Sequence, residues 1–129
     1  MKSAPLASEH QEQAAVIEWW SYACKKYKLP EFALFAIPNG GFRFKATAAK
    51  LKAEGLRPGI PDLFLAVPKR KASGLFIEMK SATGRESDPQ KNVRPYLEQY
   101  YDCVVCYSST EAIETIKQYL TTSGVLPRY

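Results

Sequence analysis

Two apolar segments of the sequence "PDLFLAVPKRKASGLFIEMKS" carry charged residues at one end. Asp62 begins the first segment, and Glu78 and Lys80 lie near the end of the second. If the segments form an antiparallel hairpin, the start of one strand lies beside the end of the other, so Asp62 approaches Glu78. Glu78 and Lys80 are two positions apart and share one face of their strand, whereas Met79 points to the opposite face, into the core. The spacing therefore predicts three charged groups at one end of one sheet face.

Adjacent carboxylates repel each other, and a divalent cation between them relieves this repulsion. Mg²⁺ binds a few hard oxygen ligands and keeps several waters, so Asp62, Glu78 and one backbone carbonyl form a suitable set. The ammonium group of Lys80 would then orient or deprotonate a water, or stabilise charge on a phosphate. Hydrolysis of a phosphodiester needs these parts. The alternative is a surface ion pair between Glu78 and Lys80, with Asp62 capping the turn after Pro61.

The segments that must position these residues alternate between strand and helix patterns. Strands with apolar residues on both faces are expected at residues 31–37, 62–67, 75–80 and 103–107. Helical patterns cover residues 8–29, 45–55, 87–100 and 108–120. The predicted fold is an α/β domain in which a mixed β-sheet is flanked by helices in the order α-β-α-β-β-α-β-α. We expect one domain over residues 1–129, with residues 1–7 and 121–129 flexible.

Several local signals support the expected helix boundaries. Ser8 and Gln11 have capping-box spacing at the first helix, and Ser87 with Gln90 at the third. Gly55 is a suitable C-cap for the second helix. Pro95 lies inside the third helical pattern, so a kink or a short first piece is expected there.

Composition limits the classes of protein that this chain can belong to. The 129 residues are 46% hydrophobic, which suffices for the core of one domain. No apolar run approaches the roughly 20 residues of a membrane span, and the N-terminus lacks the apolar stretch of a signal peptide. We therefore expect a cytoplasmic protein that has no membrane partner. A net charge of +5 and a pI near 9.1 favour a polyanionic partner.

The chain contains three cysteines, an odd number that argues against a disulfide framework. Cys103 and Cys106 have C-x-x-C spacing, but they fall within an expected strand and point to opposite faces of it. Buried apolar thiols are therefore the favoured interpretation, and a metal or redox site is the alternative.

The motifs together resemble a known family. "GIPDLFL", "LFIEMKS" and "GRESDPQ" match the PD-(D/E)xK nuclease superfamily, and more closely the VRR-Nuc (virus-type replication-repair nuclease) domain in its small stand-alone form from phages and bacteria. "EHQEQ", "PNGG", "LKAEGLRPGIPDLFL", "IEMKS" and "SDPQ" follow in the family's order, from about Glu9 to the last helix. The resemblance implies a restriction-endonuclease-like fold and an endonuclease dependent on Mg²⁺ or Mn²⁺. It also implies action on branched or Holliday-junction DNA, as a homodimer in a bacterial or phage-infected cell.

The same resemblance assigns roles to individual residues. The catalytic residues that it implies are Asp62, Glu78, Lys80 and Gln90. The metal ligands that it implies are Glu9, Asp62, Glu78 and the carbonyl oxygen of Met79, with Glu12 as the alternative glutamate on the first helix. Plain stabilisation of the helix dipole is the competing role for Glu9 and Glu12. For Gln90 the competing role is to complete the capping box of Ser87.

Basic residues in two loops are candidates for contact with DNA. In "PNGGFRFK" these are Asn39, Arg43 and Lys45, and at the hairpin tip they are Lys69, Arg70 and Lys71. The simpler interpretations are a turn with a charged surface, and a hairpin tip kept soluble by its charges.

Other conspicuous side chains are assigned to structure. Trp19 and Trp20 are expected in the core or a subunit interface, and His10, the single histidine, on a helix surface and not as a catalytic base. Two other functions remain open: a DNA-binding module of the same fold that does not cut, and a restriction-type enzyme that reads a duplex sequence.

Overall fold

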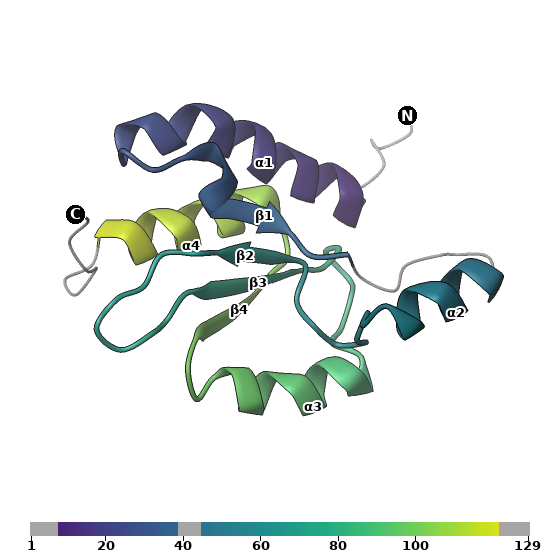
Figure 1. The fold of residues 1–129 in the computed structure, drawn as a ribbon. Coiled ribbons are helices and arrows are strands. Elements are labelled where there is room, and N and C mark those ends of the chain that lie inside the picture. The colour runs from purple at the N-terminus through teal and green to yellow at the C-terminus, as the bar shows by residue number, and fades with distance from the viewer. Residues whose placement is uncertain (1–7, 39–44, 122–129) are drawn as a thin grey trace, which may run out of the picture.

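The computed structural model describes residues 8–38 and 45–121, which form a mixed four-stranded sheet flanked by helices (Figure 1). The strands lie in the order β1 (Leu34–Ala36), β2 (Leu63–Leu65), β3 (Leu75–Met79) and β4 (Asp102–Cys106). Strand β2 is antiparallel to both β1 and β3, and β4 is parallel to β3. The helices are α1 (Glu9–Lys26), α2 (Lys45–Ala53), α3 (Asp88–Leu97) and α4 (Ser109–Thr121), with a short 3₁₀ helix at Glu31–Ala33. The predicted fold class and element order are confirmed.

Helices α1 and α4 cover one face of the sheet, and α3 lies against β4 on the other (Figure 1). The strands send alternate side chains into the layer under α1 and α4, where those of Leu63, Ile77 and Met79 are fully buried. Val16 of α1 and Ile116 of α4 close this layer from the helix side. Each such aliphatic side chain stabilises the fold by about 1.5–3 kcal/mol, so this core holds the strand register that positions the charged residues.

Helix α1 begins as its sequence predicts. Ser8 and Gln11 form both hydrogen bonds of a capping box, and Trp20 and Cys24 lie on the buried stripe. The helix ends at Lys26, before the expected residue 29, because Lys28 adopts a left-handed φ of 55°. None of the helices in the described ranges is both long enough and apolar enough to span a membrane.

The expected strand at residues 31–37 is wrong in its first part, and the short first piece expected for the third helix is not formed. The first residues of the expected strand 31–37 form the 3₁₀ helix, because the carbonyl of Glu31 accepts the indole N–H of Trp20 at 2.8 Å and is drawn out of the sheet. Helix α3 runs through Pro95 without a break. The helix ends two residues later, so the proline removes only the hydrogen bond to the carbonyl of Lys91 near its last turn.

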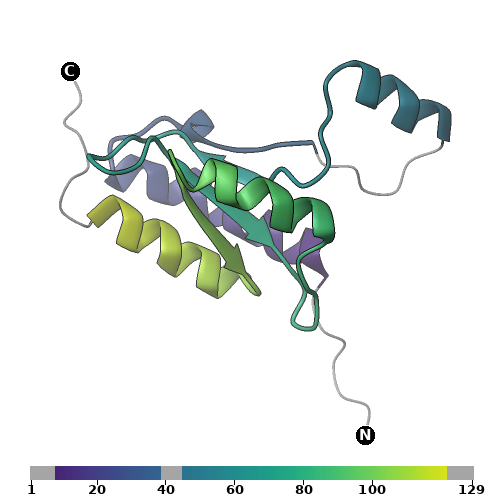
Figure 2. The same ribbon diagram turned by 90° about the horizontal axis from the view of Figure 1, so that it is seen from below.

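Helix α2 stands apart from the sheet (Figures 1 and 2). Gly55 terminates it with a φ of +106°, as predicted, and the amide of Leu56 donates to the carbonyl of Leu51 at 2.9 Å. The flexibility expected for the two chain ends concerns residues outside the described ranges, except Thr121, the last residue of α4.

Candidate active site

The hairpin of β2 and β3 brings Asp62 to Glu78. Leu63 pairs with Ile77, so Asp62 and Glu78 are the next opposed positions toward one end of the hairpin. The carboxylate of Asp62 accepts the backbone N–H of Met79 through Oδ2 at 2.8 Å, and its backbone carbonyl accepts the N–H of Ile37 at 2.8 Å. The backbone and side chain of Asp62 are therefore both held by neighbouring strands.

Glu78 is a buried acid with an unsatisfied oxygen. Glu78 is only 6% exposed, and its Oε1 has no hydrogen-bond partner among the described residues. Burial and then the negative charge of Asp62 raise the pKa of Glu78 to about 8, against the opposing charge of Lys80. A buried oxygen without a partner is costly in a folded protein, and a cation bound at this position would give Oε1 a partner.

Lys80 provides part of that charge. Its Nζ lies 3.2 Å from Oε2 of Glu78, and the residue is only 9% exposed. The backbone N–H of Lys80 donates to the carbonyl of Cys106 at 2.9 Å, which fixes the end of β3 to β4. Because the lysine stem is enclosed, its ammonium group is held at the carboxylates and is not free to swing into solvent.

Gln90 makes two contacts, one within the cap of its own helix and one with the buried acid. Its Oε1 accepts the backbone N–H of Ser87 at 2.7 Å and completes the capping box of α3. Its Nε2 donates to Oε2 of Glu78 at 2.6 Å. The start of α3 is thereby tied directly to the buried carboxylate.

The two candidate glutamates of α1 make different contacts. Oε1 of Glu9 accepts the backbone N–H of Ser81 at 3.3 Å, immediately after Lys80. Oε2 of Glu12 accepts the backbone N–H of Ser109 at 2.6 Å, at the start of α4. Glu9 therefore lies beside the end of β3, and Glu12 instead connects two helices.

Gly59 is a site residue that the sequence reading missed. It has a φ of +91°, and a Cβ atom there would lie 2.5 Å from the carbonyl oxygen of Pro89. The segment that leads into Asp62 thus packs directly against the start of α3, the same part of the helix from which Gln90 contacts Glu78. The glycine between two prolines in "RPGIP" was the available signal, but only the packing against α3 reveals what it does.

These residues fit a hard divalent cation held by few protein ligands. No three histidine, cysteine, aspartate or glutamate side chains within residues 8–38 and 45–121 lie close enough together to hold a metal ion. The available set is the carboxylates of Asp62 and Glu78 and the carbonyl of Met79, whose backbone faces Asp62. Such a set suits Mg²⁺, which keeps several waters, and it gives Oε1 of Glu78 a partner.

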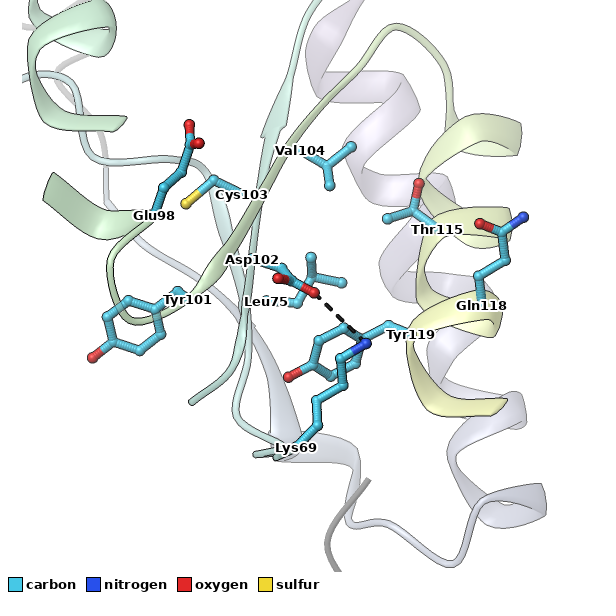
Figure 3. A pocket seen from close by; sticks show the side chains of 10 residues that line it. All are labelled: Lys69, Leu75, Glu98, Tyr101, Asp102, Cys103, Val104, Thr115, Gln118 and Tyr119. Atoms are coloured by element: carbon cyan, nitrogen blue, oxygen red, sulfur yellow. Dashed lines mark ion pairs between the residues drawn. The ribbon is translucent and has the colours of Figure 1, made fainter. Parts of the chain in front are cut away.

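The three basic residues at the hairpin tip are not equivalent. The Nζ of Lys69 lies 3.7 Å from Oδ2 of Asp102 and 4.3 Å from the centre of the Tyr119 ring (Figure 3). Lys69 helps line a cavity of about 430 Å³ between β4 and α4, which does not include Asp62, Glu78 or Lys80. Arg70 and Lys71 are exposed at the tip.

Some of the residues that the sequence suggested lie outside the described ranges. Asn39 and Arg43 lie outside the described ranges, and Lys45 begins α2 with a side chain that is not described. Trp20 is in the core and Trp19 packs against it, as expected, and His10 is exposed on α1.

The C-x-x-C thiols lie on opposite faces of β4. All three cysteines are free. Cys106 lies near the hydroxyl of Thr115 on the α4 side, whereas burial raises the pKa of Cys103, on the other strand face, to about 11. The expectation of separate, apolar thiols agrees with this geometry.

Comparisons with known proteins converge on one family. A search of curated protein sequences found no match. A solved structure described as a VRR_NUC domain protein superposes with a TM-score of 0.74 at 26% identity, covering 90% of each chain. The profile of the VRR-NUC domain matches residues 7–110, a range that contains all the acidic, lysine and glutamine residues described above. The chain therefore belongs to the VRR-NUC domain family, and its fold is of the nuclease type.

Proposed function

We propose that this protein is a metal-dependent endonuclease that hydrolyses phosphodiester bonds in branched DNA, with four-way junctions as the favoured substrate. The observation that carries the proposal is the buried oxygen of Glu78, which lacks a partner beside Asp62 and Lys80. Membership of a nuclease-type family supports the same reaction class.

In the proposed reaction, Asp62, Glu78 and the carbonyl of Met79 would hold Mg²⁺ or Mn²⁺, and the metal would supply Lewis acidity at the phosphate. Gln90 keeps the carboxylate of Glu78 in place through its hydrogen bond of 2.6 Å. The ammonium group of Lys80 orients the attacking water and stabilises the negative charge that develops on the phosphate oxygens. Glu9 supports the end of β3 through Ser81.

The proposed substrate requires more surface than one small domain offers. A single chain of this size covers few base pairs, and a two-fold homodimer presents two cutting sites to a symmetric junction. The net charge of +5 and the exposed Arg70 and Lys71 suit contact with phosphates.

A cleavage panel tests the proposal with flap, fork, four-way junction and linear duplex substrates, each in Mg²⁺ and in Mn²⁺. Wild type should cut the junction, and Lys80→Ala should lower the cleavage rate at least about 100-fold while junction affinity changes little. Binding without cleavage by wild type in either metal would identify a binding module instead. Cleavage of linear duplex alone, at one sequence, would identify a restriction-type enzyme. Light scattering of the free protein measures whether it is a dimer.

A further inference from the structure

A continuous series of aromatic rings crosses the sheet face that also carries the carboxylates. We call it the aromatic strip, and its members are Phe35, Phe64, Phe76, Tyr101, Tyr100 and Tyr96. Neighbouring ring centres along this series are 5.8, 4.5, 5.0, 6.4 and 5.8 Å apart. Rings at both ends are open to solvent: Phe35 is 43% exposed, Tyr100 51% and Tyr96 62%. The middle rings are partly buried, so the exposed surface is at the two ends, and adjacent exposed rings such as Tyr96 and Tyr100 mark an interaction site.

The register places the strip next to the candidate active site. Phe35, Phe64 and Phe76 are opposed across β1, β2 and β3. Phe64 lies two residues after Asp62, and Phe76 lies two residues before Glu78. Each aromatic residue therefore shares a sheet face with the carboxylate on its own strand. Two residues along a strand span about 7 Å, which corresponds to about two nucleotides of a stacked strand. The exposed tyrosines lie farther along, at the tip end of the hairpin, so a DNA strand with a phosphate at Glu78 must extend beyond Phe76 to reach them.

The strip is fixed by packing around the hairpin. A Cβ atom on Gly74 would lie 2.4 Å from the Phe64 ring, so this glycine leaves room for the aromatic side chain. At the other end, the carbonyl of Tyr100 accepts the N–H of Ser73 at 2.7 Å. This bond holds the exposed tyrosines next to the hairpin tip.

The charges around the exposed tyrosines favour a polyanion. Arg70 and Lys71 are exposed in the tip, within three residues of Ser73. Two nearby carboxylates have ion-pair partners: Asp102 pairs with Lys69 at 3.7 Å, and Glu98 pairs at 3.6 Å with Arg94, which also pairs with Glu86. Exposed rings near exposed cations are the combination that binds single-stranded nucleic acid, since bases stack on the rings and phosphates meet the cations.

We propose that the aromatic strip binds unpaired nucleotides of the DNA, with bases on Tyr96 and Tyr100 and phosphates at Arg70 and Lys71; this rests on the proposed function, which makes DNA the ligand. Bases inside a duplex already stack on their neighbours and cannot stack on protein rings. The strip therefore recognises the unpaired segment of a branched or frayed substrate. Its ligand class is single-stranded DNA of any sequence.

The experiment measures DNA affinity in the Lys80→Ala background without added metal, so that cleavage plays no part. Fluorescence anisotropy compares a labelled oligothymidylate with a labelled duplex of equal length at one salt concentration. Replacing both Tyr96 and Tyr100 by Ala should weaken single-strand binding roughly 30-fold or more, at about 1–3 kcal/mol per stacked base, and change duplex binding less than about 2-fold. Replacing both tyrosines by Phe should restore single-strand binding, because the rings are retained. Tyr22→Ala is the matched control, since Tyr22 is 73% exposed on α1, across the sheet.

Unchanged single-strand affinity in the double alanine variant overturns the inference, and so does an equal loss for both probes or failure of the Phe variant to restore binding. If light scattering shows that the alanine variant loses a dimer while its single-strand affinity is retained, the strip is an interface between copies and the inference falls. If the predicted binding pattern is found but the wild-type protein cuts no DNA, the proposed nuclease function is refuted and the strip remains a single-strand binding site.

Discussion

Gln90 donates to Glu78 at 2.6 Å while it caps the helix on which it stands. One side chain thus completes the first turn of α3 and holds the buried acid of the candidate site. Helix stability and site geometry are coupled through this residue, and substitutions can separate the two contributions.

Ser87→Ala removes the side-chain oxygen of the cap but leaves the bond between Gln90 and Glu78. We expect it to lower the free energy of unfolding by about 1 kcal/mol and to leave the cleavage rate nearly unchanged. Gln90→Ala should cost similar stability and also lower the cleavage rate about 10-fold or more, since Oε2 of Glu78 loses its neutral partner. Urea denaturation and single-turnover cleavage measure the two effects. Equal cleavage rates in the two variants would show that Gln90 serves the helix alone.

Gly59→Ala should disrupt the packing of the segment before Asp62 against the start of α3. Gly55 and Gly59 both have positive φ, so alanine at either position strains the backbone by about 1–3 kcal/mol. Nothing lies within 4 Å of a Cβ on Gly55, whereas a Cβ on Gly59 would meet the carbonyl of Pro89 at 2.5 Å. Gly55→Ala is therefore the matched control, and Gly59→Ala should lose more stability and more cleavage. Equal melting temperatures for the two variants would contradict this packing.

Glu12 should make stability depend on pH in the acidic range. Hydrogen bonds from the side chain and backbone of Ser109 lower the pKa of Glu12 below its usual 4.5. A lowered folded-state pKa adds stability above the unfolded pKa, and that stability disappears as the pH falls through the folded value. Glu12→Gln should therefore be less stable than wild type by about 0.5–1 kcal/mol at pH 7, allowing for solvent screening, and equally stable in strong acid.

Denaturation of both proteins across this pH range tests the expectation for Glu12. Glu18→Gln, which changes an exposed glutamate of the same helix, serves as the control. A gap between wild type and Glu12→Gln that persists unchanged in strong acid would rule out this ionic contribution.

Mg²⁺ or Mn²⁺ should stabilise the folded chain through Glu78. Binding to the folded state alone adds about 2.7 kcal/mol when the metal is present at 100 times its dissociation constant. Thermal melting in a chelator and in excess metal should show a rise for wild type and little change for Glu78→Gln, which keeps the side-chain volume but not the charge. The same rise in the variant would place the metal elsewhere on the chain.

The pairing of Asp62 with Glu78 could be predicted from sequence because it depends only on strand periodicity and on hairpin geometry. The capping boxes of α1 and α3 were predictable for the same reason, since each depends on residues three apart. The family resemblance added the role of Gln90, and the structure adds that its capping role and its contact with Glu78 occur together.

Features that depend on distant packing could not be predicted. Lys69 was grouped with Arg70 and Lys71, but its ion pair with Asp102 forms only after β4 has docked. The short 3₁₀ helix reflects the bond between Trp20 and Glu31, which no local pattern announces. The contact of Gly59 with Pro89 likewise depends on the position of α3, which no local pattern gives.

The contacts of α1 also bear on how the protein is made. Glu9 bonds a residue 72 positions later, and Glu12 bonds one 97 positions later. A chain growing on the ribosome has its first helix long before either partner exists. Full docking of α1 must wait until Ser109 has emerged, so a chain that stops before this residue lacks the contact that ties α1 to the start of α4. The first helix made is therefore among the last to be completely secured.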